Sequence, residues 1–348
     1  MTQRPRKALI IGAGIAGPVT AMFMKRAGID AAVYEAWPYS TGIGGGLQIA
    51  PNGMHVLAEL GLADQLIKRG SVAESFDFYS QAGQKLGSIN RHMKERFGQP
   101  ALNLSRATLN ESLIDRAWCS NVELHFDRRL VAIEDRADRP LVAHFADGSS
   151  AEGDFLIGAD GVHSTVRRHV IPDGPKPFDT GLIGFGGFVP RAVLANRAIG
   201  QRVETTFGQS GFFGCGVCSS DPDVGVMWWS TQPSNGINAA HYRAMSQADL
   251  RQHLRRFHAG WHDPIPAIID AAVYEAWPYS TGIGGGLQIA PNGMQVLAEL
   301  GLTDEIIRRG SVAESFDFYS QSGRRLGSVN RNMRERFGQP AVNRAARH

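Results

Sequence analysis

The chain has 348 residues, 43% hydrophobic and 20% charged, which is enough for about two domains with a sizeable core. Its 36 basic and 33 acidic residues give a net charge of +3 without a long run of one sign. This balance argues against a nucleic-acid partner and favours small molecules. No stretch is as long as a membrane span, and the apolar run after the basic N-terminus is too short for a secretory signal. The three cysteines suit a reducing compartment, so we expect a cytoplasmic protein.

A dinucleotide-binding pattern comes first. The sequence predicts a strand over 7–12, a glycine turn from Gly12 through Gly14 to Gly17, a helix over 18–27 and a second strand over 31–34. Glu35 ends that strand 18 positions after Gly17, close to the spacing of an acidic residue that holds a ribose. Glycines let the backbone approach a pyrophosphate, and the helix N-terminus offers it N–H groups. A plain glycine-rich turn is the alternative, and the pattern does not separate NAD from FAD.

A second motif bears on that choice. A short apolar strand over 155–157 leads into Asp160-Gly161, and Ser164 is placed to cap a following helix. This stretch resembles the Asp-Gly motif of the group A FAD-dependent monooxygenases, the para-hydroxybenzoate hydroxylase family. There the aspartate at the strand end contacts FAD, and the region also serves NAD(P)H. The resemblance implies FAD as the cofactor and NAD(P)H as a transient reductant, whereas the alternative is a solvated Asp-Gly turn.

Two further segments resemble the same family. The glycine-rich segment 42–53 is similar to the loop beside the flavin ring, and Arg106 is similar to the FAD-binding arginine at a helix start. By spacing alone, Arg106 would be a surface residue of an amphipathic helix continued by Leu109, Leu113 and Ala117. No residue is identified as a catalytic base. The candidate cofactor-binding residues are Gly12, Gly14, Ile15, Ala16, Gly17, Glu35, Gly45, Arg106, Asp160 and Gly161.

From about 178 to 229 the pattern changes to short aromatic runs broken by glycine, which predicts antiparallel strands. In the resembling family such a sheet forms the substrate side of the pocket. Because side chains alternate along a strand, we expect at most half of the aromatic residues to face a pocket. These residues are Phe185, Phe188, Phe212, Phe213, Trp228 and Trp229.

Two patterns that could indicate a metal are better explained otherwise. Cys215 and Cys218 have the spacing of a redox pair or of half a zinc site, but they lie in a strand-rich segment rather than at a helix start and no other cysteine pair completes a zinc site, so we expect buried thiols. His258 and His262 are four residues apart, but neither a neighbouring glutamate nor a third ligand accompanies them. We therefore expect no metal.

The chain also repeats itself. Residues 29–103 and 269–343 align without a gap, and 63 of the 75 aligned pairs are identical. We favour a fusion with a paralogous segment, and a cloning or assembly error is the alternative. The second copy lacks the first strand and the glycine turn, so its Glu275 is not expected to be a second ribose ligand. The family's second FAD motif, Gly-Asp-Ala-Ala-His, does not occur in this sequence.

Together these features predict an α/β protein with a fold like para-hydroxybenzoate hydroxylase. We expect a Rossmann-like FAD-binding domain over 1–175, a β-rich substrate domain over 176–268 and the diverged repeat over 269–348. The resemblance implies an FAD-dependent monooxygenase that hydroxylates a small aromatic or similar electron-rich substrate with NAD(P)H and O2. The alternatives are a flavin-binding reductase or oxidase of the same fold and an inactive fusion. The oligomeric state and the particular substrate stay open.

Overall fold

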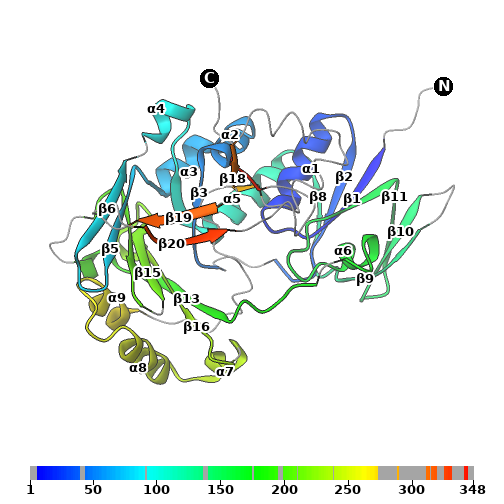
Figure 1. The fold of residues 1–348 in the computed structure, drawn as a ribbon. Helices are drawn as coiled ribbons and strands as arrows, with labels where there is room; N and C mark the ends of the chain where they lie inside the picture. The colour runs from blue at the N-terminus through cyan, green and yellow to red at the C-terminus, as the bar shows by residue number, and fades with distance from the viewer. Residues whose placement is uncertain are drawn as a thin grey trace.

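The computed structural model describes residues 6–39, 44–90, 92–135, 140–174, 176–194, 199–209, 211–237 and 239–272. Beyond these it describes the backbone of 288–289, 311–313, 315–319, 325–330 and 341–343. Figure 1 shows two main bodies of sheet, one around the early strands and one around the middle of the chain. Among the described helices, none is both long enough and apolar enough to cross a bilayer.

The first body is a four-stranded parallel sheet with strand order β12-β1-β2-β8. Its strands are β1 (Lys7–Ile11), β2 (Asp30–Tyr34), β8 (Glu123–His125) and β12 (Phe155–Gly158). Helices α1 (Ala16–Arg26) and α5 (Arg106–Cys119) cover one face, where Ile10 and Val33 join the largest core cluster. Leu9 and Ile11 alternate to the other face. The predicted strand, turn, helix and strand are therefore confirmed.

A three-stranded antiparallel sheet lies against that other face. It consists of β9 (Leu130–Glu134), β10 (Leu141–Phe145) and β11 (Ser150–Gly153). Leu130, Ala143 and Phe145 pack with Leu9 and Ile11 in one buried cluster. The parallel sheet is thus buried on both faces, which explains why β1 is a continuous apolar run. The short helix α6 (Thr165–Val170) follows β12.

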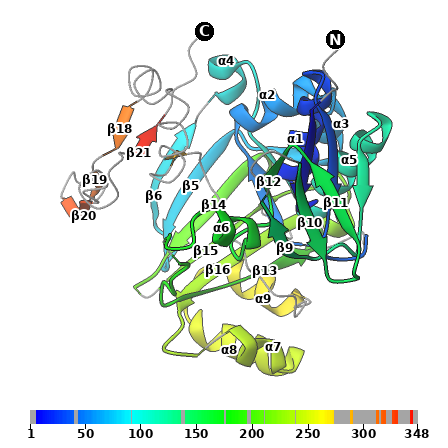
Figure 2. The same cartoon turned by 90° about the vertical axis from the view of Figure 1, so that its right-hand side faces the viewer.

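The second body is a six-stranded sheet with strand order β13-β16-β15-β14-β5-β6. Its strands are β5 (Ser75–Ser80), β6 (Lys85–Asn90), β13 (Leu182–Val189), β14 (Arg202–Phe207), β15 (Phe212–Val217) and β16 (Val226–Pro233). Figure 2 shows helices α7 (Ala239–Ala244), α8 (Gln247–Phe257) and α9 (Ile265–Ala271) on one face of it. The predicted β-rich segment is present. However, β5 and β6 lie within the predicted first domain and extend this sheet, so the boundary at residue 175 stays a prediction.

A small sheet lies between the two bodies. It has the order β3-β7-β4, formed by β3 (Gly46–Ile49), β4 (Ser71–Val72) and β7 (Leu102–Ser105). Helices α2 (Pro51–Glu59), α3 (Ala63–Arg69) and α4 (Met93–Phe97) belong to the same part of the chain. A Cβ added at Gly46 would lie 2.4 Å from Sδ of Met227 on β16. Glycine at this position therefore allows the small sheet to contact the large one closely.

The described strands of the second copy repeat the pairing of the first. They are β17 (Gln288–Ile289), β18 (Ser311–Ala313), β19 (Ser315–Tyr319), β20 (Arg325–Asn330) and β21 (Ala341–Asn343). Strand order β17-β21-β18 reproduces β3-β7-β4, and β19 pairs with β20 as β5 pairs with β6. Glu275 lies outside the described residues.

Candidate functional site

The glycine turn contains two kinds of glycine. Gly12 has a φ of +107°, and a Cβ there would lie 2.4 Å from the carbonyl oxygen of Ala159. A Cβ at Gly17 would lie 1.9 Å from the carbonyl oxygen of Gly12. These two glycines are needed for the packing of strand and helix. At Gly14 a Cβ would meet only the Arg106 guanidinium, at 3.7 Å, so this position leaves room for a ligand to approach the backbone.

The start of α1 fits an anionic group. Ile15 is the N-cap and Ala16 the first helical residue, and no side chain caps this end. The first turn carries no acidic residue. Its N–H groups, together with the positive end of the helix dipole, suit a pyrophosphate.

Glu35 lies against the glycine turn. Its Oε2 accepts a hydrogen bond of 2.7 Å from the backbone N–H of Ala13, and its Oε1 accepts one of 3.1 Å from that of Trp37. A carboxylate has about four lone-pair positions, so capacity remains for hydroxyl donors such as those of a ribose. The carboxylate predicted from spacing is thus fixed beside the turn by two backbone donors.

Arg106 brings a cation to the same place. It is the first residue of α5, whose N-cap Ser105 accepts a hydrogen bond from Thr108 N. The backbone N–H of Arg106 donates to the carbonyl oxygen of Gly45 over 2.8 Å, which ties the 44–46 loop to the helix. A Cβ at Gly44 would lie 2.9 Å from Cδ of Arg106. The structure therefore brings Gly45 and Arg106 together, with the guanidinium beside the glycine turn.

Asn110 is a site residue that the sequence analysis missed. Its Nδ2 donates to the carbonyl oxygens of Ala13, at 2.9 Å, and Gly14, at 2.8 Å. It lies one helical turn after Arg106, on the same side of α5. The four-residue spacing from Arg106 could have indicated Asn110 as a site residue, but only once Arg106 was known to face the turn.

Asp160 has a clear structural role. Its carboxylate accepts hydrogen bonds from Ser164 Oγ at 2.5 Å and from the backbone N–H groups of Thr165, at 2.6 Å, and Val166, at 3.3 Å. It thereby provides hydrogen-bond acceptors for the backbone N–H groups at the start of α6, where Ser164 is the N-cap as predicted.

The backbone of the Asp160-Gly161 turn lies close to the glycine turn. The backbone nitrogen of Asp160 lies 3.0 Å from a Cβ built at Gly12. Gly161, with a φ of +77°, has open space beside it. A contact of this carboxylate with FAD stays a prediction.

The aromatic residues of the six-stranded sheet divide between its two faces. Phe185, Phe213 and Trp228 pack in the core under the helices, where Phe213 and Trp228 stack with ring centroids 5.6 Å apart. Phe188, Phe212 and Trp229 alternate to the opposite face, which we call the far face. The expected division by alternation is confirmed, and half of the six lie on the far face.

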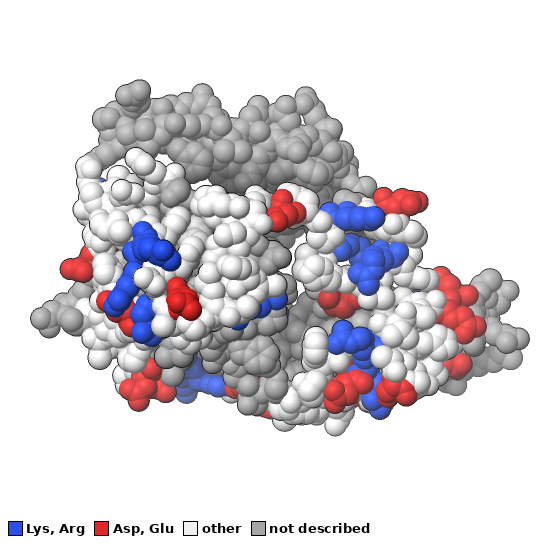
Figure 3. Space-filling view, turned by 90° about the horizontal axis from the view of Figure 1, so that it is seen from below, with Lys and Arg blue, Asp and Glu red and all other residues white. Residues whose placement is uncertain are grey.

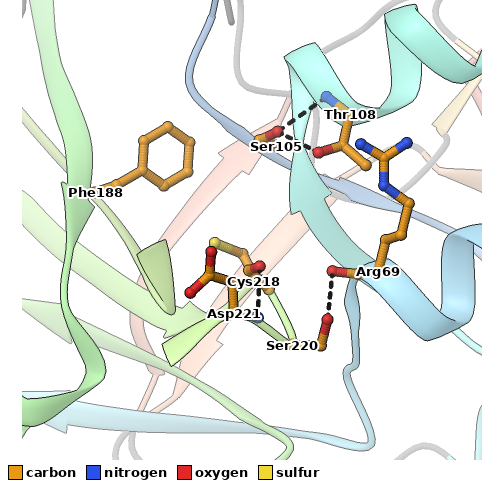
Figure 4. A pocket seen from close by; sticks show the side chains of 8 residues that line it. Arg69, Ser105, Thr108, Phe188, Cys218, Ser220 and Asp221 are labelled. Atoms are coloured by element: carbon orange, nitrogen blue, oxygen red, sulfur yellow. Dashed lines mark hydrogen bonds between the residues drawn. The ribbon is translucent and has the colours of Figure 1, made fainter. Parts of the chain in front are cut away.

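A cavity of about 300 Å³ opens beside Phe188. Figure 4 shows the ring facing a polar wall that comes from the start of α5, the end of α3 and the loop after β15. The guanidinium of Arg69 donates to Ser112 Oγ over 3.0 Å and pairs with Glu111. The cavity can therefore take a small ligand with one flat apolar side. Its lining residues are Arg69, Ser105, Thr108, Phe188, Cys218, Ser219, Ser220 and Asp221.

The residues weighed as metal ligands have other partners. Cys215 and Cys218 are buried, and burial raises the pKa of the Cys218 thiol to about 12. His258 is hydrogen-bonded to Ser230 Oγ, whereas His262 contacts Thr206 Oγ1. Within the described ranges, no group of three or more side chains is arranged to hold a metal. Basic and acidic side chains are interspersed over the face shown in Figure 3.

This fold and site define a dinucleotide-binding flavoprotein in which a Rossmann-like sheet is joined to a large mixed sheet. The family model described as FAD binding domain matches residues 6–267. The chain belongs to this family, and the predictions of its fold and of FAD as its cofactor are confirmed.

Curated relatives agree with this assignment. The chain is 36% identical over 197 residues to 3-amino-4-hydroxybenzoate 2-monooxygenase of Streptomyces cremeus, covering 56% of this chain and 49% of that protein. It is 28% identical over 285 residues to 6-hydroxynicotinate 3-monooxygenase of Pseudomonas fluorescens, covering 78% of this chain and 70% of that one. The chain thus spans about half to seven-tenths of the length of these relatives.

A solved structure supports the same family assignment. HpxO of Klebsiella pneumoniae, complexed with FAD and uric acid, is 30% identical and superposes with a TM-score of 0.66. The match covers 77% of this chain and 65% of that chain.

Proposed function

We propose that the protein is an FAD-dependent monooxygenase that uses NAD(P)H and O2 to hydroxylate a small aromatic or heterocyclic substrate. The observation that carries this proposal is the convergence of Glu35, Arg106 and Asn110 on the glycine turn of the FAD-binding family. Bound FAD would supply hydride acceptance from NAD(P)H and, once reduced, reaction with O2. The relatives named as monooxygenases support the same reaction class.

The chain's own residues would bind the dinucleotide as follows. The N–H groups at Ile15 and Ala16 would face the pyrophosphate, with Gly14 leaving the space. Glu35 would accept hydrogen bonds from ribose hydroxyls, and Arg106 would offset the phosphate charge. Gly45 would hold the loop beside the flavin ring, and the Asp160-Gly161 segment would line the turn from the β12 side. None of these roles requires a side chain to act as a catalytic base.

The far face of the large sheet supports an aromatic substrate. Phe188, Phe212 and Trp229 lie on it, and the Trp229 indole packs flat against the backbone of Gly214, where a Cβ would lie 2.2 Å from the ring. Flat apolar rings pack well against such surfaces, with a few polar groups fixing their orientation. The cytoplasm, where NAD(P)H is supplied, is the proposed location.

Two other functions remain as candidates because the sequence lacks the family's second FAD motif. A flavin-binding reductase or oxidase would oxidise NAD(P)H without inserting oxygen into a substrate. An inactive fusion would bind no flavin.

The visible absorption spectrum of the purified protein, with and without added FAD, is the first test. Bound flavin absorbs directly, whatever the substrate. Protein that takes up FAD would then be screened with NADPH, O2 and a panel of hydroxylated aromatic acids. Substrate-dependent NADPH oxidation with a hydroxylated product supports the proposal. Oxidation that yields only hydrogen peroxide supports the reductase or oxidase. Protein that takes up no flavin overturns both.

A further inference from the structure

The second copy, residues 269–343, contains a second version of the β5–β6 hairpin, which forms one edge of the large sheet. Strand β19 consists of the same five residues as Ser75–Tyr79 of β5. Strand β20 differs from β6 only in Arg325 for Lys85 and Val329 for Ile89. Both replacements keep the charge or the apolar character of the side chain. The pattern of residues that seats β5–β6 therefore occurs twice in the chain.

The two hairpins also have the same internal register. Ser315 pairs with Asn330 as Ser75 pairs with Asn90. In both hairpins the register shifts at the same place, between Phe78 and Tyr79 in β5 and between the matching residues of β19. The hairpin is thus formed by its own sequence at two different places in the chain.

The outer edges of the two hairpins differ. β5 pairs in parallel with β14, with Thr205 opposite Phe78. Asp77 is buried there, in contact with Lys85 Nζ at 3.0 Å, and Phe78 lies 6.2 Å from the ring of Phe207. Within the described part of the chain, β19 is paired with β20 alone. A strand edge with unpaired backbone groups is a template for another strand.

We propose that β19–β20 and β5–β6 are alternative occupants of the same edge of β14, so that the second copy exchanges with the first within one molecule. In the exchanged state, Phe318 takes the position of Phe78 opposite Thr205. Asp317 takes the position of Asp77, and Arg325 provides the positive charge that Lys85 provides in the first hairpin. The 16 residues 272–287 link α9, which covers this sheet, to β17 at the start of the second copy's strands, and a chain of that length spans on the order of 50 Å when extended. The link therefore reaches β14.

A competition between two thiols tests the exchange. One variant carries Thr205→Cys, Phe78→Cys and Phe318→Cys, with the exposed Cys119 changed to serine. Paired parallel strands lie about 4.8 Å apart, within the Cα separation that a disulfide accepts. The protein is refolded under reducing conditions, so that both hairpins compete, and then oxidised with diamide. Peptide mapping identifies the partner of position 205.

The expected result is two disulfides, 205 to 78 and 205 to 318, with the minor one at about 0.1–10%, as for a minor conformational state. The ratio should not depend on protein concentration. A disulfide to position 78 alone overturns the proposal. A disulfide to position 318 that joins two chains and increases with concentration also overturns the intrachain assignment, and identifies a second copy of the chain as the partner.

Two further variants serve as controls for the cross-linking experiment. Thr205→Cys with Phe318→Cys leaves the native β5 unaltered, so a cross-link there does not depend on weakening the first hairpin. Thr205→Cys with Gly327→Cys places the thiol on β20, one strand further from β14. This control should form no disulfide, and equal cross-linking at position 327 would show that the contact is random and refute the exchange.

Discussion

Asn110 ties helix α5 to the glycine turn by donating hydrogen bonds from one nitrogen to the carbonyl oxygens of Ala13 and Gly14. The bond to Gly14 is 2.8 Å long. Arg106, one turn earlier, lies beside the same glycine. One face of α5 therefore both fixes the conformation of the turn and supplies its positive charge.

The change Asn110→Ala should weaken FAD binding by about tenfold, because two hydrogen bonds that preorganise the turn are lost, each contributing about 0.5–1.5 kcal/mol. Quenching of flavin fluorescence in a titration gives the dissociation constant. Asp115→Asn, on the exposed side of the same helix, is the control and should leave affinity unchanged. Equal affinities of the Asn110→Ala and parent proteins would contradict this role.

Substitutions at the two kinds of glycine in the turn should affect folding and FAD binding separately. Gly14→Ala adds a Cβ that meets only Arg106, so thermal stability should hold while FAD binding is lost to the occupied space. Gly17→Ala places a Cβ 1.9 Å from the oxygen of Gly12, so it should lower the melting temperature even without FAD. Melting curves and flavin titrations of both variants provide the check. A Gly14→Ala protein that still binds FAD normally would remove this residue from the site.

Phe188 and Phe213 should behave differently although they belong to one sheet. Phe213 is 1% exposed, so Phe213→Ala should cost about 3–5 kcal/mol of unfolding free energy. Phe188 lines the cavity on the far face, so Phe188→Ala should destabilise less and weaken binding of an aromatic ligand instead. Chemical denaturation and ligand titration with the best compound of the aromatic panel measure the two effects. An unchanged ligand affinity in Phe188→Ala would place the substrate elsewhere.

His258 should make stability depend on pH. Burial lowers its pKa to about 4, against a usual value of 6.5, and the neutral ring is hydrogen-bonded to Ser230 and to the Leu254 carbonyl. Above pH 6.5 the ring is neutral in both states and contributes no pH dependence. Between pH 6.5 and 4 only the unfolded chain takes up the proton, so up to about 3 kcal/mol of stability is lost on acidification.

Replacing the ring tests that assignment. His258→Gln should flatten the dependence of unfolding free energy on pH over this window, whatever its effect on stability at pH 7. His169→Gln, at an exposed position, is the matched control and should keep the parent slope. If both variants keep it, other groups cause the acid sensitivity.

Local sequence was sufficient for the nucleotide-binding unit. The strand, the glycine turn, the helix and Glu35 are contiguous, and each residue type has a local reason at its position, so all four could be placed in advance. Asn110 could not, because its role depends on how α5 packs against a turn that lies almost 100 residues earlier in the chain. The pairing of β5 with β14 was missed for the same reason, since nothing near residue 75 indicates a partner near residue 202.

The repeat shows most directly what local sequence determines and what tertiary structure determines. Residues 29–32 and 269–272 have the same sequence, Ile-Asp-Ala-Ala. In the first copy Asp30 begins strand β2, paired with Lys7 of β1, whereas in the second copy Asp270 belongs to helix α9. The sequence by itself determined a short segment compatible with either state, because local preferences differ by only a fraction of a kcal/mol per residue. Tertiary structure decided between them, since β1 offers a parallel partner to Asp30, whereas Ile269 is buried with Ile265 and Ile268 under the large sheet.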